Sequence, residues 1–297
     1  MTSIPNATIT FPMLGDGFKV TAPPSFDVFG LTIHWYGVII AMGFLLAVWY
    51  GSKNSERFGI KFDTIIDLLI WDVPLSIIGA RIYYVIFYFD LYRDNFWDVF
   101  KIWNGGLGFY GALIATIITI SVFCKRRNIK IGALLDFAAP GLLIGQSVGR
   151  WGNFINREAF GVETDVFCRM GLTTADGTSV FVHPTFLYES LWNALGLLLI
   201  WIFLKKGKRK YDGQVFAMYI GWYGMARFMI EGLRTDSLYL FSTGIRVSQL
   251  VGGLCVLGSI IYLAVNGSRK RDRSQLFVNQ VKARQKEEAE KADDDVE

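Results

Sequence analysis

Three long stretches without a charged residue limit what this chain can fold into. They are Val28–Gly51, Gly105–Cys124 and Val247–Val265, and none of them contains Asp, Glu, Lys or Arg. A helix needs about 20 mainly apolar residues to cross the hydrocarbon core of a bilayer. Each stretch is long enough to do so, and together they predict a protein that crosses a membrane several times.

Four further segments are apolar but carry one or a few charges: Thr64–Phe89, Ile131–Asn156, Pro184–Leu204 and Gln214–Ile230. Charged residues make up 19% of the chain, whereas soluble domains usually contain about 25%. A water-soluble bundle of seven such helices does not fit this composition. The sequence therefore predicts an all-α fold, a polytopic integral membrane protein with seven transmembrane helices.

Basic residues gather in alternate loops, which sets the expected orientation. They are frequent in "SKNSERFGIK" (52–61), "KRRNIK" (125–130), "KKGKRK" (205–210) and after Gly267, and sparse in the loops between. Lys and Arg accumulate on the cytoplasmic side of membrane proteins. We therefore expect the N-terminus outside and the C-terminus in the cytoplasm.

The same pattern divides the chain into three parts. We expect residues 1–27 to form an external segment without signal-peptide character, and their alternation, as in "ATITFPM" (7–13), indicates a short strand or an interfacial segment. Residues 28–266 form the seven-helix transmembrane domain. Residues 267–297, which end in "KEEAEKADDDVE", are expected to be a disordered cytoplasmic tail.

Cysteine and histidine are too few and too scattered for a metal site or a disulfide framework. The chain has 3 Cys and 2 His, and the cysteines (Cys124, Cys168 and Cys255) are far apart. We expect no metal and no cofactor.

Polar residues at membrane depth are functional candidates, because an ionisable group in hydrocarbon is costly. Two sets of them have helical spacing: Arg150, Asn153 and Arg157 (i, i+3, i+7), and Arg227, Glu231 and Arg234 (i, i+4, i+7). Both sets fall toward the external ends of their segments. Arginine binds phosphate oxygens in pairs and keeps its charge, so two such faces would suit a phosphate group.

A structural explanation of these arginines stays open. They could snorkel to the interface or pair with Glu158 and Glu231 inside the bundle. Arg81, in "IIGARIYYVIF", is either a ligand-binding residue or the internal partner of an aspartate on a helix.

Several motifs resemble one known family. They are "IHWYGVIIAMGF" (33–44), "IWNGGLGFYGALI" (102–114), "GQSVGRWGNFINREAFG" (145–161), "HPTFLYES" (183–190), "DGQVF" (212–216) with "YGMARFMIEGLR" (223–234), and "RVSQLVGG" (246–253). From about Phe29 to Leu263 the chain resembles the bacterial phosphatidylglycerol–prolipoprotein diacylglyceryl transferases. The "GR-x-GNF-x-N-x-E" core is nearly specific to that family.

The resemblance implies a reaction and its partners. Diacylglyceryl would be transferred from phosphatidylglycerol to the lipobox cysteine thiol of a prolipoprotein signal peptide, leaving a thioether and glycerol phosphate. This is the first step of lipoprotein maturation. The implied location is the bacterial cell membrane, with the active site facing outward. The partners would be the lipid, the signal peptide and the bilayer, and no nucleic acid.

The resemblance and the residues themselves together give the expected site of this sequence. The expected catalytic set is Arg150, Arg227, Tyr36, Asn153, Glu158, Tyr110 and His34. The expected phosphatidylglycerol-binding set is Arg150, Asn153, Asn156, Gly161, Glu231, Arg234 and His183. Tyr36 could instead be an interfacial anchor, and Gly161 a helix-end glycine.

One position departs from the family pattern. Well-studied members have a histidine in the "GG-x-x-FHGG" motif, often assigned as the base for the thiol proton, and this sequence has Tyr110 there. A tyrosine with a pKa near 10 is a poor base at neutral pH. His34, His183 and Glu158 remain alternative proton acceptors, and a strong base could also be unnecessary.

Two other function classes fit buried arginines in a seven-helix protein. One is a lipid or anion transporter with an arginine-lined site, although inverted repeats and broken helices are not visible in the sequence. The other is a receptor-like binding protein with its ligand at the outer helix ends.

Overall fold

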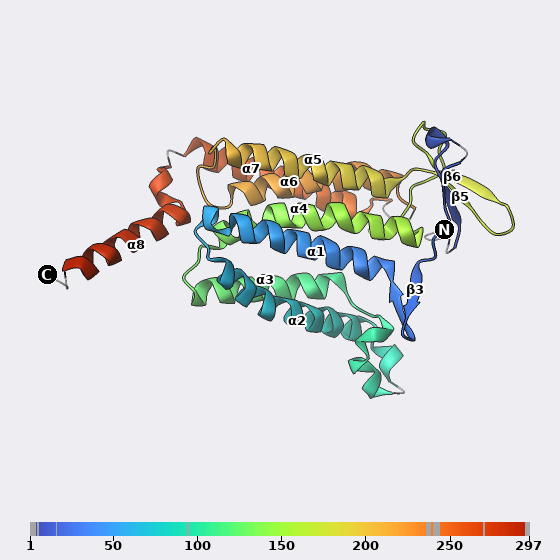
Figure 1. The fold of residues 1–297 in the computed structure, drawn as a ribbon, viewed down its shortest axis with the longest axis horizontal. Helices are drawn as coiled ribbons and strands as arrows, with labels where there is room; N and C mark the ends of the chain where they lie inside the picture. Colours follow the sequence, from blue (N-terminus) through green and yellow to red (C-terminus); the bar gives the residue numbers. More distant parts are fainter. Residues whose placement is uncertain are drawn as a thin grey trace. The chain divides into compact units, whose positions relative to one another are not determined.

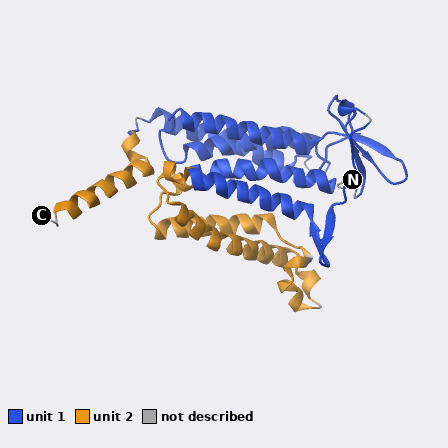
Figure 2. Ribbon diagram, in the orientation of Figure 1, with its two compact units in different colours: residues 1–53, 136–272 blue, residues 54–135, 273–297 orange. Residues whose placement is uncertain are grey.

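The structure is a computed structural model that describes residues 4, 6–15, 17–93, 95–235, 239, 244–269 and 271–294. Two compact units divide the chain (Figure 2). Unit 1 comprises residues 1–53 and 136–272, and unit 2 comprises residues 54–135 and 273–297.

Unit 1 is a bundle of long helices with a small sheet at one end (Figure 1). Its helices are α1 (Trp35–Asn54), α4 (Ile131–Asn156), α5 (Thr185–Lys205), α6 (Gln214–Ile230) and α7 (Val247–Ser268). Short 3-10 helices lie at Pro12–Leu14 and Glu231–Leu233. The core between α4, α5 and α6 consists of buried Ala139, Leu143, Ile200, Val215 and Tyr219.

Two polar contacts fix the start of α6 against α4. Asp136 of α4 accepts hydrogen bonds from the backbone N–H groups of Gly213 and Phe216, both at 2.9 Å, so its carboxylate caps the otherwise unpaired first turn of α6. Arg209 lies 3.1 Å from the same carboxylate. This cap sits at the opposite end of α6 from Arg227 and fixes which face of the helix is turned toward α4.

The sheet of unit 1 has the strand order β2-β1-β5-β6, and every pairing is antiparallel. Its strands are β1 (Thr8–Thr10), β2 (Lys19–Val20), β5 (Met170–Thr173) and β6 (Ser179–Val182). Ile9 pairs with Leu172, and both are fully buried against Phe154 and Phe186, whose rings lie 4.6 Å apart. The sheet therefore packs on the ends of α4 and α5 that carry the candidate motifs.

A hairpin precedes α1, so the first long helix begins later than the sequence predicts. Strands β3 (Ser25–Val28) and β4 (Leu31–His34) pair antiparallel, and the helix begins only at Trp35. Residues 28–34 therefore belong to the hairpin and its turn, although they are as free of charge as the helix that follows.

Unit 2 contains a helix pair, an irregular loop and the C-terminal helix. Its elements are α2 (Phe62–Phe87), α3 (Phe109–Arg126) and α8 (Phe277–Asp294), with short 3-10 helices at Ser55–Phe58, Phe89–Tyr92, Phe96–Phe100, Ile102–Asn104 and Arg273–Gln275. The sequence predicts a disordered tail, whereas the structure has a helix over Phe277–Asp294.

Five helices in the described part of the chain are long and apolar enough to cross a membrane: α1, α3, α4, α5 and α7. Their large apolar side chains are widely exposed, as at Leu45 (65%) and Leu254 (59%). A water-soluble surface does not tolerate so much contiguous apolar area. The chain is mostly helical, and the exposed apolar surface of these helices is consistent with several membrane spans.

Candidate active site

Charged residues from three helices meet around Glu189. Its Oε2 lies 2.6 Å from Nη2 of Arg150, and its Oε1 lies 3.3 Å from Nη1 of Arg234 and 3.8 Å from Nη1 of Arg227. Arg150 comes from α4, Glu189 from α5, Arg227 from α6, and Arg234 follows the short helix after α6. We call Arg150, Glu189, Arg227, Glu231 and Arg234 the arginine cluster.

The carboxylates of the arginine cluster are more deeply buried than its arginines. The side chains of Glu189 and Glu231 are 4% and 3% exposed, whereas Arg150, Arg227 and Arg234 are 24%, 17% and 11% exposed. The carboxylates neutralise guanidinium groups that would otherwise repel each other in a poorly solvated site. Guanidinium edges remain accessible to a ligand, which favours an anionic one.

A second row of hydrogen bonds orients Arg150. Its Nη1 donates to Oδ1 of Asn153 at 3.2 Å, and Nδ2 of Asn153 donates to Oε1 of Glu158 at 2.8 Å. Nδ2 of Asn156 reaches the same oxygen at 3.4 Å. Because Asn153 accepts from the arginine and donates to the glutamate, its amide orientation is fixed by both neighbours.

Arg227 is held in a similar way on α6. Its Nη2 lies 2.8 Å from Oε2 of Glu231, one turn further along, and donates to Oγ of Ser248 on α7 at 3.3 Å. The α6 and α7 backbones touch at Gly224 and Gly252, where a Cβ on either residue would lie within 2.7 Å of the other's carbonyl oxygen. This close crossing brings α7 to Arg227. Arg246, just before α7, donates to the Glu231 carbonyl.

Gly161 joins the loop after α4 to the loop after α6. Its N–H donates to the carbonyl of His183 at 2.9 Å, and it bridges to Arg234. A Cβ at Gly161 would lie 2.6 Å from Cβ of His183, so a larger residue would push these backbones apart. Gly161 is needed here for a close approach, and α4 ends five residues earlier, at Asn156.

Tyr36 lies against the α4 turn that carries Arg150. A Cβ on Gly152 would lie 2.6 Å from the Tyr36 ring, so the ring packs directly on the helix backbone two residues beyond Arg150. The Tyr36 side chain is 38% exposed at the start of α1. This position fits a role beside the arginine cluster as well as an interfacial one.

Arg157 does not share the face of Arg150 and Asn153, so the i, i+3, i+7 prediction is wrong for its last member. The helix ends at Asn156 and Arg157 adopts a φ of 50°, which turns it out of the helical register. Its buried guanidinium donates to the carbonyls of Ala7 (2.9 Å), Ala22 (2.7 Å) and Ile155. Arg157 ties the N-terminal segment to the end of α4.

His183 lies beside the arginine cluster in a different network. Its Nδ1 is 3.2 Å from the hydroxyl of Tyr188, which is 3.3 Å from Sγ of Cys168. Burial lowers the pKa of His183 below its usual 6.5, which favours the neutral ring. A neutral imidazole can accept a proton.

Two further predicted site residues lie in the hairpin before α1 and at the start of α3. His34 is exposed at the end of β4, opposite Ser25 in the hairpin. Tyr110 belongs to unit 2, at the start of α3, where it is 52% exposed and its ring centre lies 6.3 Å from that of Tyr83.

Arg81, for which the sequence left two roles open, is bonded to backbone carbonyls rather than to an aspartate carboxylate. Its guanidinium donates to the backbone carbonyls of Asp98 (2.6 Å), Val99 (2.7 Å), Gly105 (2.7 Å) and Gly106 (2.9 Å). It holds the loop between α2 and α3 in place.

Glu189 is the residue that the sequence reasoning missed. It was visible as the single charge in an otherwise apolar segment, and it falls within the motif "HPTFLYES". An isolated carboxylate at membrane depth is by itself a signal of function or of a buried ion pair. Among the described residues no group of three or more His, Cys, Asp or Glu side chains could hold a metal ion.

Comparisons with known proteins place the chain in a family. Residues 23–265 match the family model described as prolipoprotein diacylglyceryl transferase. Three similar proteins, each named phosphatidylglycerol–prolipoprotein diacylglyceryl transferase, come from Finegoldia magna, Enterococcus faecalis and Streptococcus pneumoniae.

Similarity to these relatives extends over most of the chain. The Finegoldia protein is 45% identical over 237 residues, which cover 80% of this chain and 92% of that protein. The corresponding figures are 41% over 269 residues (88% and 95%) for the Enterococcus protein and 44% over 244 residues (81% and 92%) for the Streptococcus protein. With its several apolar helices, the chain is a multi-pass membrane protein, and it belongs to the prolipoprotein diacylglyceryl transferase family.

Proposed function

We propose that this chain transfers the diacylglyceryl group of phosphatidylglycerol to the lipobox cysteine of prolipoproteins. The observation that carries the proposal is the arginine cluster, in which three guanidinium groups from α4, α6 and the loop after α6 surround one buried carboxylate. In a member of this family, a cluster of that kind suits the phosphate of the lipid substrate.

The chemical step is an alkylation of sulfur. The thiolate forms a bond to C3 of the diacylglyceryl group, the bond from C3 to the phosphate oxygen breaks, and its electrons leave with glycerol phosphate. The thiol proton passes to a base or to the departing phosphate. Guanidinium groups already in position stabilise the charge that grows on the leaving oxygen, without having to reorganise during the reaction.

Arg150 and Arg227 are the arginines that we assign to the phosphate. Both face Glu189, so a bound phosphate would share or replace that carboxylate as their counter-ion. Asn153 and Glu158 hold Arg150 in orientation, and Glu231 does the same for Arg227. Glu189 balances the charge of the arginines when no lipid is bound, and the phosphate balances it when the lipid binds.

Three residues remain candidates for the proton acceptor. Glu158 accepts hydrogen bonds from Asn153 and Asn156, and His183, whose pKa is lowered by burial, accepts a backbone hydrogen bond from Gly161. Tyr110 occupies the position where other members have histidine. We favour a mechanism without a strong base, because nearby arginines lower the pKa of the substrate thiol.

We further propose seven spans, with α2 and α6 added to the five helices of suitable length and composition. α2 has 26 residues, and α6 has 17. Basic loops at 52–61, 125–130 and 205–210 support an outside N-terminus. The arginine cluster then faces the outer side of the bacterial cell membrane.

The transporter alternative differs in its product. A transporter would move phosphatidylglycerol or an anion and leave it unchanged, whereas the transferase leaves a covalent label on sulfur. The test is to mix the detergent-solubilised protein with phosphatidylglycerol labelled in its acyl chains and a lipobox peptide. We expect label on the peptide cysteine and none on a peptide with serine there. An unlabelled cysteine peptide, with lipid bound to the protein, would contradict the proposal.

A further inference from the structure

An apolar groove lies in unit 2, between α2 and α3. The groove has a volume of about 360 Å³ and is lined by Trp71, Leu75, Ile118, Thr119, Val122, Phe123, Arg126 and Arg127. Its apolar side chains are open to the surroundings, as Trp71 (63% exposed) and Ile118 (57%) illustrate. One end of this apolar groove therefore carries two adjacent guanidinium groups.

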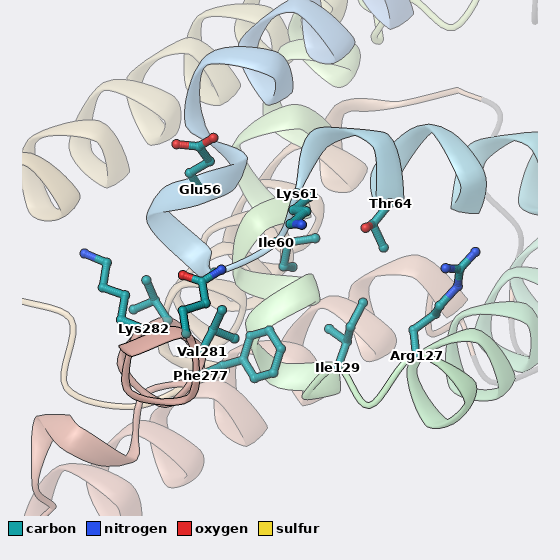
Figure 3. Close-up of a pocket in the computed structure, with 12 residues that line it drawn as sticks. Glu56, Ile60, Lys61, Thr64, Arg127, Ile129, Phe277, Val281 and Lys282 are labelled. Carbon is teal, nitrogen blue, oxygen red and sulfur yellow. The ribbon is translucent and has the colours of Figure 1, made fainter. Parts of the chain in front are cut away.

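A second cavity shares Arg127 with the groove. It has a volume of about 500 Å³ and lies between the start of α2, the α3–α4 loop and the first turns of α8. Figure 3 shows Ile60, Ile129 and Phe277 gathered in its middle, with Lys61 beside them and Arg127 at one side. Arg127 thus belongs to both the groove and the cavity.

The charge balance of the two cavities favours an anion. Their cations are Lys61, Arg126, Arg127 and Lys282, and the carboxylates on or paired to them are Glu56 and Asp67. The Arg127–Asp67 pair is 2.8 Å long, but its side chains are 54% and 45% exposed, so it contributes little and yields easily to a competing anion. Arginine has five N–H donors, more than one carboxylate occupies.

We propose that the groove and the cavity together bind one anionic phospholipid that is not the substrate. An acyl chain lies along Trp71, Ile118 and Val122, and the phosphate lies at Arg126 and Arg127. Lys61 then faces the outer part of the headgroup. Basic pockets at the cytoplasmic ends of membrane helices are suited to such headgroups. A free phosphate would use the cations but would leave the apolar groove unoccupied.

This lipid would join three elements that are far apart in the sequence. The cavity lies beside the first turns of α8, which is held by a hydrogen bond from Lys130 Nζ to the carbonyl of Gln275 at 2.7 Å and by buried Phe277. A lipid seated against α2, α3 and α8 stabilises unit 2 without touching any residue of the arginine cluster.

The test is lipid retention by the purified full-length protein, measured by native mass spectrometry with dioleoyl phosphatidic acid. Arg126→Gln/Arg127→Gln removes the cations, and Val122→Trp fills the groove while both arginines stay. The matched control, Lys205→Gln/Lys206→Gln, removes two cations from a different loop. We expect the first two variants to lose one bound phosphatidic acid, with at least tenfold weaker binding, and the control to bind like wild type.

Other probes separate the lipid from a simple anion and from the surrounding bilayer lipid. Dioleoyl phosphatidylcholine should bind equally to all variants, and inorganic phosphate should not raise the melting temperature as phosphatidic acid does. The proposal is overturned if the two groove variants retain phosphatidic acid like wild type, or if the control loses as much. It is also overturned if phosphate protects equally and Val122→Trp has no effect, which would indicate a free-anion site.

Discussion

Glu189 is the residue that holds the three arginines of the cluster together. It is 4% exposed and lies within 4 Å of three guanidinium groups. Removing one partner of a buried ionic network leaves the remaining charges uncompensated, which costs about 3–5 kcal/mol. Under the proposed function the lipid phosphate supplies a further compensating charge when it binds. Glu189 therefore keeps the arginines close together before the lipid binds.

We expect Glu189→Gln to lower kcat by at least about tenfold, without raising KM for phosphatidylglycerol. The amide keeps the size of the side chain but removes the charge that aligns the arginines, while the more positive site still attracts the anionic lipid. Initial rates at several lipid concentrations test this, with Glu163→Gln, an exposed loop residue, as the matched control. A raised KM with unchanged kcat would show that Glu189 acts in binding rather than in alignment.

Arg150 should not tolerate a change to lysine. Lysine keeps the charge but cannot engage Glu189 and Asn153 with two separate N–H groups, as Arg150 does at 2.6 and 3.2 Å. We expect Arg150→Lys to insert normally and to lose about 100-fold in kcat/KM, on the order of 2.7 kcal/mol. The control is Arg93→Lys, because Arg93 is exposed and pairs with Asp90 one turn away. A loss of threefold or less would make Arg150 structural.

Tyr110 should be replaceable by phenylalanine. If its hydroxyl is not the base, Tyr110→Phe retains most of kcat, and any loss appears in KM for the lipid. If the phenol is the base, the variant is inactive. The measurement is the pH profile of both proteins. Absence of turnover in a correctly inserted Tyr110→Phe protein at every pH would assign Tyr110 to the chemistry.

At the scale of elements, the sequence predicted most helices well and some of their ends poorly. The segments expected at 131–156 and 214–230 are helices with those same bounds, because charge and turn residues mark their ends. The first span was misplaced by seven residues. Its hairpin turn uses Phe29 and Gly30, with φ of 51° and 81°, and a phenylalanine in that conformation gives no turn signal.

The four-stranded sheet could not be predicted from the sequence either. Its strands are two to four residues long, and β1 pairs with β5 across more than 150 residues of chain. Alternation in a short segment indicates a strand but not its partner. Arg157, whose buried guanidinium is bonded to Ala7 and Ala22, could be understood only once that pairing was known.

The docking of α8 depends on Gly59. Gly59 has a φ of +78°, and a Cβ there would lie 2.7 Å from Cα of Val278. Gly207, with a φ of +61° and nothing within 4 Å of an added Cβ, is a matched control for the backbone strain alone. Both alanine variants bear a strain of about 1–2 kcal/mol, but only Gly59→Ala also displaces α8.

Hydrogen exchange of the α8 amides measures this difference. We expect the first turns of α8 to exchange at least about tenfold faster in Gly59→Ala than in wild type, and at the wild-type rate in Gly207→Ala. Equal exchange in all three proteins would mean that α8 is not held at Gly59.

At the scale of the whole molecule, the sidedness of the membrane protein decides where lipid and thiol meet. The charge pattern of the loops is the basis of the proposed orientation, since basic loops remain cytoplasmic. The positions of the native cysteines in the sequence suggest that they could report on this orientation by chemical labelling. Their surroundings in the structure make them poor reporters. Cys124 is 1% exposed, so its failure to react would say nothing about sidedness, and Cys168 lies 3.3 Å from the Tyr188 hydroxyl.

Introduced cysteines at exposed positions give a clearer answer. In a chain whose native cysteines are replaced by alanine, Ala175→Cys lies at the exposed tip of the β5–β6 hairpin and Lys125→Cys at the exposed end of α3. A membrane-impermeant maleimide added to intact, wall-stripped cells should label the first and spare the second until the membrane is opened. The hairpin packs on the helix ends that carry Arg150 and Glu189, so its labelling also assigns the arginine cluster to the outer side. Labelling of Lys125→Cys alone from outside would reverse the orientation. The arginine cluster would then lie on the cytoplasmic side, and the thiol of a prolipoprotein would have to reach it before export.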